Sequence, residues 1–549
     1  MLSNTSNIAL LVVVVAMSIS MALIPLMIRL APVLGMMDKP DPRKVHAVPI
    51  PRVGGVGIVL GALLPLAFWL PWNDLTLSYL MGSVVLLIFG IWDDIKQLGH
   101  YVKFVGQFIA VLMVVYHGDL YISYLPFMGK EPIDDAVGRI FTVIAMVGVI
   151  NAINHSDGLD GLAGGESLLS LGGIAYLAGQ ADDTVVTMIA LAAMGGVFGF
   201  LRFNSHPARV FMGDGGSQFL GFTLAFLVAY LAKVSNPALS PALPALLLGL
   251  PVVDILSVLV RRLRGGMNLF KATKNHVHHR LLELGFYHYE SVMVIYSVQV
   301  ALVVGGVLMP YESDALIIGF YVLVCSTLFV GLKLAEDRSW KAHQGKGETL
   351  LGRLVGGFNA DSSLMAFNYG LMQMLLSVFL FAGAVLVVDV PGDVSLAAAV
   401  LFVALLLRLW LGHRVWFLFL RLILFVAVAF AAYLLEFYPP TGWDGFSPAY
   451  HWSLGILAVA VVLAVRFSDG EFFRATPLDY LLLLIVVIFA LASEFGYADS
   501  STITMILQLI VLFYGVEVTL KHMRSRKNTF TIAALVSLGV LVVRGLLFQ

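Results

Sequence analysis

Long apolar runs recur along this chain and limit the folds that it can adopt. About 20 helical residues are needed to cross the hydrocarbon core of a bilayer, and runs near that length alternate here with short polar loops. Of the 549 residues, 60% are apolar and only 12% are charged, so a soluble fold could not bury this much apolar surface. The sequence therefore predicts an all-α, polytopic integral membrane protein.

The expected transmembrane helices form two groups. Some runs in the first group have only 14 residues, so flanking turns or neighbouring helices must complete them. The first group, eleven spans of a domain over residues 1–333, comprises 8–30, 54–72, 79–92, 104–117, 137–153, 166–180, 184–201, 216–233, 239–260, 292–310 and 315–333. The second group, about seven spans of an additional domain over residues 367–549, comprises 367–388, 394–411, 415–435, 451–467, 477–496, 502–520 and 529–547. We expect residues 334–366 to form a cytoplasmic linker.

Lys and Arg residues predict the orientation, because short loops rich in them stay on the cytoplasmic side. If the loops after odd-numbered spans face the cytoplasm, all but four of the 33 Lys and Arg residues lie at or beside cytoplasmic ends. The exceptions are Lys130, Arg139, Lys233 and Arg544. No basic residue precedes the first run and Arg29 ends it, which indicates a retained span with its N-terminus outside.

Four polar clusters interrupt the apolar pattern, and each follows an odd-numbered span. They are WDDIKQLGHYVKFVGQ, NAINHSDGLDGLAGG, RVFMGDGGSQFLG and KATKNHVHHRLLELGF. Taken alone, DD is typical of a solvated helix end, GDGG of a turn, and HVHH of a polar loop. All four nevertheless fall on the predicted cytoplasmic side, and the outer loops carry nothing comparable. Together they predict a single functional site.

The residue types in these clusters indicate phosphoryl transfer. Asn154, Asp157 and Asp160 recur at every third position at the membrane boundary. Two negative charges about 4 Å apart repel by about 4 kcal/mol at an effective dielectric near 20, so clustered acids need a cation. Oxygen ligands favour Mg²⁺ or Mn²⁺ over zinc, and neither an HExxH motif nor a phosphate-binding GxxxxGK[ST] loop is present. Nearby bases that could hold phosphates are Lys103, His276, His278, His279 and Arg280.

At these motifs the chain resembles the polyprenyl-phosphate N-acetylhexosamine-1-phosphate transferase superfamily. The matching segments are DD (93–94), NAIN..DGLDGLAGG (151–165), FMGDGGSQFLG (211–221) and NHVHHRLLELGF (275–286). The resemblance covers about residues 8 to 333. It implies Mg²⁺-dependent transfer of a sugar 1-phosphate from a UDP-sugar to a polyprenyl phosphate such as undecaprenyl phosphate, with release of UMP. It also implies an enzyme of the cell inner membrane whose active site faces the cytoplasm.

The resemblance further implies roles for individual residues. Asn154 and Asp214 would bind the metal, and Asp93 and Asp94 would place or deprotonate the lipid phosphate, although an ionised phosphate need not have a base. Asp160 would contact the uracil. The complete catalytic set would be Asp93, Asp94, Lys103, Asp157, His276, His278 and His279. The substrate-binding set would be Asn151, Asp160 and Arg280.

Several alternatives stay open at the level of sequence. The HVHHRLLELGF segment is similar to the branch that uses UDP-N-acetylglucosamine to begin O-antigen, teichoic acid or capsule synthesis, and the muramoyl-pentapeptide transferase of peptidoglycan synthesis is the alternative. Intramembrane acids also mark transporters, but those usually place polar groups at the midplane of the bilayer. A catalytically silent assembly factor is a third possibility. The single Cys325 excludes an intrachain disulfide, the net charge of −1 gives no indication of nucleic-acid binding, and a homodimer is possible.

Overall fold

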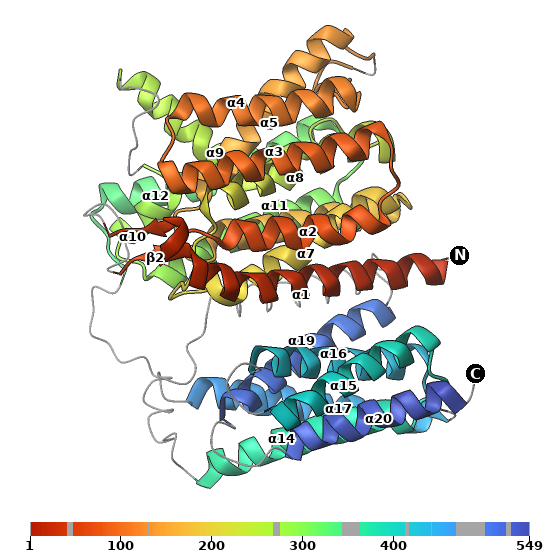
Figure 1. Ribbon diagram of the computed structural model, residues 1–549. Coiled ribbons are helices and arrows are strands. Elements are labelled where there is room, and N and C mark those ends of the chain that lie inside the picture. The colour runs from red at the N-terminus through yellow and green to blue at the C-terminus, as the bar shows by residue number, and fades with distance from the viewer. Residues whose placement is uncertain are drawn as a thin grey trace. The chain divides into compact units, whose positions relative to one another are not determined.

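The computed structural model describes residues 2–40, 48–129, 131–266, 275–342, 363–411, 417–440, 442–467, 500–522 and 529–547. These residues are almost entirely helical and form two compact units (Figure 1). Nine of the described helices are long and apolar enough to cross a membrane. The predicted fold class, an all-α polytopic membrane protein, is therefore confirmed.

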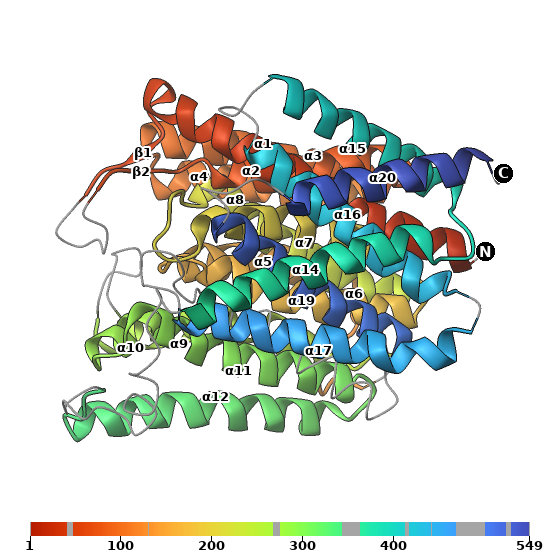
Figure 2. The same ribbon diagram turned by 90° about the horizontal axis from the view of Figure 1, so that it is seen from below.

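In the first unit a helix accounts for most of each of the eleven predicted spans. These helices are α1 (Leu2–Leu34), α2 (Gly54–Trp69), α3 (Asp74–Lys96), α4 (His100–Leu112) continued by the π-helical turn η1 (Met113–His117), α5 (Asp135–Ser156), α6 (Leu162–Gln180), α7 (Thr184–Asn204), α8 (Gly213–Tyr230) continued by η2 (Leu231–Ser235), α9 (Leu243–Arg264), α11 (His288–Leu308) and α12 (Asp314–Asp337). The short elements are β1 (Met37–Asp38), β2 (Ile50–Pro51) and α10 (Val277–Glu283). Figure 2 shows that β1, β2 and α10 lie at one end of the bundle, opposite the N-terminus of α1.

Polar caps fix where four of the odd-numbered spans begin. The side chains of Asn73, Asp134, Asp183 and Ser313 accept hydrogen bonds from backbone N–H groups in the first turns of α3, α5, α7 and α12. Such caps satisfy donors that a helix leaves unpaired at its start. Because these helices begin at the capped end, the polar motifs that follow α3, α5 and α7 lie at the other end.

Helix α8 is the centre of the first unit. All of its residues from Gly215 to Tyr230 are buried, as expected for a helix that is apolar on every side. The backbone of its first turn packs directly against α3 and α2. A Cβ atom added to Gly90 of α3 would lie 2.2 Å from the Cα of Gly215. A Cβ atom added to Gly55 of α2 would lie 2.3 Å from the nitrogen of Gly216. The glycines of the GDGG motif therefore bring three helices into backbone contact.

The second unit contains α14 (Ser363–Val385), α15 (Gly392–Leu411), α16 (Phe417–Phe437), α17 (Trp443–Phe467), α19 (Ser500–His522) and α20 (Thr529–Leu547). Its apolar core includes the buried Leu376, Leu424 and Leu512. The predicted span at 477–496 lies outside the described residues. Helix α12 extends into the first residues of the expected linker, and residues 343–362 of that linker also lie outside the described residues.

Two of the basic residues that depart from the predicted orientation have local partners. Arg139 forms an ion pair with Asp119, and Lys233 donates a hydrogen bond to the carbonyl oxygen of Asp119 over 2.8 Å. Both cations also lie over the ring of Tyr121, at 4.4 and 3.3 Å from its centroid. Aromatic and acidic neighbours thus compensate these charges at the end of the bundle away from the polar motifs.

Candidate active site

Three of the polar motifs meet at Asp214, in the first turn of α8. Lys103 of α4 forms ion pairs with Asp214 and with Asp93 of α3, where the Nζ–Oδ2 distance is 2.8 Å. Asn154 of α5 donates from Nδ2 to Asp214 Oδ1 over 3.2 Å and to Ser217 over 2.8 Å. The structure therefore brings residues from four helices together at one point.

Backbone conformation places Asp94 beside the same turn. The N–H of Asp214 donates to Asp94 Oδ1 over 3.2 Å. The preceding Gly213 has a φ of 72°, and a Cβ atom on it would lie 2.5 Å from Asp94 Oδ2. A side chain at this position would therefore be strained and would also displace the carboxylate. Glycine is therefore required at position 213 for two reasons: the positive φ of the turn, and the close approach of Asp94 to Asp214.

A pocket of about 470 Å³ opens beside this cluster, within the usual range for small-molecule sites. The residues of the predicted site that line it are Asp94, Asn154, Asp157, Asp160, Asp214 and His279. The pocket also contains residues that the sequence did not single out: Asp38, Arg52, Asn204, His206 and His288. Asn151 does not line the pocket and instead donates to Gln107 over 2.8 Å.

The DGLDG loop supplies two carboxylates to the pocket. Removal from water raises the pKa of Asp157 to about 7, and the negative charges of Asp214 and Asp160 add to this rise. Asp160 is held in place by its Oδ2 atom, which accepts a hydrogen bond from the N–H of Ala208 over 3.0 Å and lies 2.7 Å from His206 Nδ1. Burial thus favours the protonated form of Asp157, whereas hydrogen bonds fix the position of Asp160.

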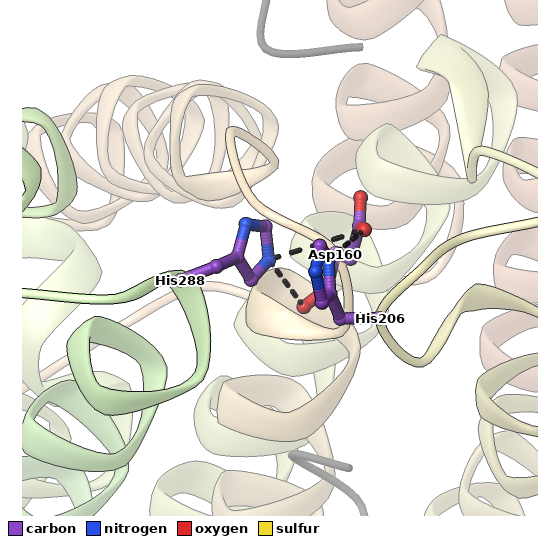
Figure 3. A group of neighbouring side chains, drawn as sticks. All are labelled: Asp160, His206 and His288. Carbon is purple, nitrogen blue, oxygen red and sulfur yellow. Dashed lines mark hydrogen bonds and ion pairs between the residues drawn. The ribbon is translucent and has the colours of Figure 1, made fainter. Parts of the chain in front are cut away.

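Asp160, His206 and His288 form a cluster at the edge of the pocket, in which both imidazole rings turn a nitrogen toward the carboxylate (Figure 3). Their ligand atoms all lie within 4.8 Å of one another, as a metal site would require. The two rings, however, are stacked with centroids 4.2 Å apart and planes 21° from parallel. A metal ion binds an imidazole in the plane of the ring, and rings stacked in this way cannot both reach one ion. We interpret the cluster as a hydrogen-bonded wall of the pocket.

The histidine segment begins at a carboxylate of α9. Asp254, which is buried, lies 2.7 Å from His276 Nδ1 through its Oδ2 atom and accepts the N–H of Val277 through Oδ1 over 3.0 Å. The next histidine contacts the DGLDG loop, because a Cβ atom added to Gly158 would lie 2.3 Å from His278 Nε2. Burial lowers the pKa of His278 well below its usual value, so this ring is neutral at physiological pH. His276 and His278 thus hold α10 against the site, and His279 reaches the pocket.

Arg280 lies in a different environment from the one that the sequence predicted. Its guanidinium is buried and makes two bonds to Glu336 of α12, with Nε–Oε1 and Nη2–Oε2 distances of 2.6 and 2.9 Å. It does not line the pocket. The structure therefore gives Arg280 the role of joining α10 to α12, where sequence analysis expected contact with the substrate.

The donor atoms around Asp214 fit a hard divalent cation. Asp93, Asp94 and Asp214 place three carboxylates near one another, and Asn154 adds an amide group. Carboxylate and amide oxygens are ligands that Mg²⁺ and Mn²⁺ accept readily. Lys103 neutralises only part of this negative charge. A divalent ion bound by Asn154 and Asp214 would supply the positive charge that the acids lack.

Comparison with known proteins yields a family and several relatives. Residues 76–232 match the family described as "Glycosyl transferase family 4". The chain is 31% identical to a "Probable undecaprenyl-phosphate N-acetylglucosaminyl 1-phosphate transferase" of Bacillus subtilis, over 50% of this chain and 77% of the relative. It is 29% identical to an "Undecaprenyl-phosphate alpha-N-acetylglucosaminyl 1-phosphate transferase" of Haemophilus influenzae, over 53% and 84%. A "Decaprenyl-phosphate N-acetylglucosaminephosphotransferase" of Mycobacterium tuberculosis is 31% identical, over 56% and 85%.

Proposed function

We propose a specific reaction for this chain, which belongs to the polyprenyl-phosphate N-acetylhexosamine-1-phosphate transferase superfamily. It transfers N-acetylglucosamine 1-phosphate from UDP-N-acetylglucosamine to undecaprenyl phosphate. The products are undecaprenyl-diphospho-N-acetylglucosamine and UMP. The observation that carries the proposal is the convergence of Asp94, Asn154 and Asp214 on one pocket at a single end of the helix bundle.

The bond changes follow from this assignment. An oxygen of the lipid phosphate attacks the β-phosphorus of the UDP-sugar, and a new phosphorus–oxygen bond forms. The bond between that phosphorus and the oxygen bridging to the α-phosphate breaks, and UMP leaves with the electron pair. All reacting groups are anionic, so the barrier contains a large electrostatic contribution.

The residues near Asp214 reduce this electrostatic barrier. Asn154 and Asp214 would hold Mg²⁺ or Mn²⁺, which when bound would neutralise charge on the phosphates. Lys103, fixed between Asp93 and Asp214, offsets part of the negative charge that these carboxylates present to the incoming phosphate. Asp94, whose position is set by the N–H of Asp214, orients the lipid phosphate. Asp157 adds a further polar side chain to the pocket lining beside these residues.

The remaining polar residues of the pocket suit the nucleotide. Asp160 lies there with His206 and His288, and we assign it to the uracil. His279 lines the pocket from α10, where it contacts the diphosphate or the sugar. His276 and His278 support α10 from behind. The names of the three relatives contain N-acetylglucosamine, which favours this sugar over the muramoyl-pentapeptide.

The place of the reaction follows from charge and from the position of the site. The distribution of Lys and Arg supports a pocket on the cytoplasmic face of the inner membrane, where it would receive a soluble UDP-sugar. The product would begin a cell-surface polysaccharide such as O-antigen, teichoic acid or capsule. The pocket lies at the end of the bundle, which supports an enzyme over a carrier with a midplane site. The second unit would scaffold the transferase or couple it to later steps.

The test uses the purified full-length protein with UDP-N-acetylglucosamine and undecaprenyl phosphate. We expect release of UMP in the presence of Mg²⁺, and loss of release after chelation or in Asp214→Ala. Turnover that continues without any metal would contradict the mechanism. If this sugar fails while another UDP-N-acetylhexosamine reacts, the reaction class stands and the assigned sugar is wrong.

A further inference from the structure

Arg52 introduces a permanent positive charge into a pocket lined mostly by acids. Among the described residues that line the pocket, Arg52 is the basic side chain that stays charged at every pH near neutrality. The other basic side chains of the lining are histidines. The carboxylates that line the same pocket are Asp38, Asp94, Asp157, Asp160 and Asp214. Lys103 lies behind Asp93 and Asp214, outside the lining.

Backbone hydrogen bonds hold Arg52 beside the segment that leads into α8. Phe211 N–H donates to the carbonyl of Pro51 over 2.8 Å, and Gly54 N–H donates back to the carbonyl of Phe211 over 2.9 Å. Gly55 N–H then donates to the carbonyl of Met212 over 2.7 Å. These three bonds align the chain around Arg52 with the two residues that precede the GDGG motif. The position of Arg52 is therefore fixed relative to Asp214.

A buried carboxylate orients the guanidinium. Asp38 of β1, whose side chain is only 6% exposed, forms an ion pair with Arg52 through Nη2. The side chain of Arg52 is 25% exposed and lines the pocket. A guanidinium has five N–H donors, so the contact with Asp38 fixes one edge and leaves donors for a ligand. This combination of a fixed base and remaining donors suits recognition of an oxyanion.

We propose that Arg52 binds a phosphate oxygen of a substrate in this pocket. The inference rests on the proposed function, since that reaction brings two phosphates of the nucleotide and one of the lipid to a site lined by carboxylates. Arginine binds phosphates through paired N–H groups, and its charge offsets the repulsion from the surrounding acids. The bound phosphate belongs to the UDP-sugar or to the lipid, and the two share this chemistry.

The competing explanation is that Arg52 only closes the hairpin of β1 and β2 through its ion pair with Asp38. The two explanations make different predictions for Asp38→Asn. This change removes the ion pair but keeps an oxygen acceptor and leaves the Arg52 charge in the pocket. A purely structural Arg52 predicts equal effects of Asp38→Asn and Arg52→Gln, whereas a phosphate-binding Arg52 predicts a far larger effect of Arg52→Gln.

The experiment measures KM for each substrate separately in the full-length protein, with the other substrate saturating. The variants are Arg52→Gln, Arg52→Lys and Asp38→Asn, with Arg338→Gln as the control for loss of an exposed positive charge after α12. We expect Arg52→Gln to raise KM for one substrate by about 10- to 100-fold, the effect of one charge-assisted hydrogen bond. Arg52→Lys should be intermediate. Asp38→Asn should raise the same KM by much less than Arg52→Gln does, because Arg52 keeps its charge in the pocket and loses only one orienting contact. Arg338→Gln should stay near wild type.

The substrate whose KM rises identifies the phosphate that Arg52 binds. Unchanged KM values in Arg52→Gln, or equal changes in Arg52→Gln and Asp38→Asn, would overturn the inference. If Arg52→Gln folds poorly, Arg52→Lys, which keeps the charge but loses the paired donors, decides in its place. Wild-type turnover is measured first, so its absence refutes the proposed function, whereas turnover without an Arg52 effect refutes only this inference.

Discussion

Replacing Lys103 by Gln tests the electrostatic design of the site most simply. The Nζ atom lies 2.8 Å from Asp93 Oδ2 and also pairs with Asp214, while only 26% of the Lys103 side chain is exposed. Gln has a similar length but no charge, so the variant leaves two neighbouring carboxylates without their shared cation. We expect the variant to be less stable than the wild type and to regain stability when a divalent ion binds.

The size of the effect follows from the two ion pairs. Opposite unit charges about 3 Å apart attract by about 6 kcal/mol at an effective dielectric near 20, and desolvation offsets much of this. Removal of one partner from a fully buried pair costs about 3–5 kcal/mol. Because about a quarter of the Lys103 side chain is exposed and screened by water, we expect a loss of about 2–3 kcal/mol.

The assay is thermal unfolding of the full-length protein in detergent, with and without MgCl₂. Lys333→Gln, at an exposed position of α12, is the matched control. Without magnesium the Tm of Lys103→Gln should fall below that of both wild type and control, and magnesium should reduce the deficit. A Tm equal to that of the control, or a deficit that magnesium leaves unchanged, would refute the reasoning.

Three further predictions concern the histidine segment, helix packing and the second unit. Asp254→Asn should lower kcat by about 10-fold in a steady-state assay, because His276 loses the carboxylate that orients it; unchanged kcat would contradict this. Gly90→Ala should destabilise the protein by about 1–3 kcal/mol in thermal unfolding, whereas Gly148→Ala, inside α5 with no atom within 4 Å of the added Cβ, should not; equal stability of the two would contradict the close packing. Deletion of residues 364–549 should leave UMP release measurable, and complete inactivity of a folded truncation would count against an independent transferase unit.

The positions of the helices were predictable from sequence because a membrane span is a long apolar run. The residues at which the helices begin and end were harder to predict. The apolar run 79–92 is only the middle of α3, which extends from Asp74 to Lys96. Hydropathy excludes the polar first turn after Asn73 and the last turn with its aspartates, although capping and site contacts stabilise both as helix.

The meeting of the motifs was also predictable, since alternation of spans puts the ends of odd-numbered helices on one side. Asp94, Asn154 and Asp214 do lie together. The contribution of Arg52 was not predictable, because it depends on a two-residue hairpin whose pairing with Phe211 is a tertiary contact. Roles for the individual site residues remain predictions until activity is measured.

Two further residues show what a sequence leaves undetermined. Asp254 carried a usable signal, since it is a lone acid in the apolar run GLPVVDIL, and such residues are usually paired or functional. Its partner, His276, could not be deduced from that signal. Arg280 showed the opposite problem: its charge suggested a substrate contact, but only the fold reveals Glu336 of α12 within bonding distance. Long-range partners of charged residues depend on tertiary packing.

The most direct measurement follows the β-phosphate of the donor. UDP-N-acetylglucosamine that carries radioactive phosphorus in its β-phosphate is incubated with undecaprenyl phosphate, Mg²⁺ and the full-length protein, and the lipid and aqueous phases are separated. The proposed reaction predicts that the label moves into the lipid phase and that unlabelled UMP appears in the water. Label that stays in the aqueous phase as UDP, while the sugar moves to the lipid, would contradict transfer of the sugar 1-phosphate.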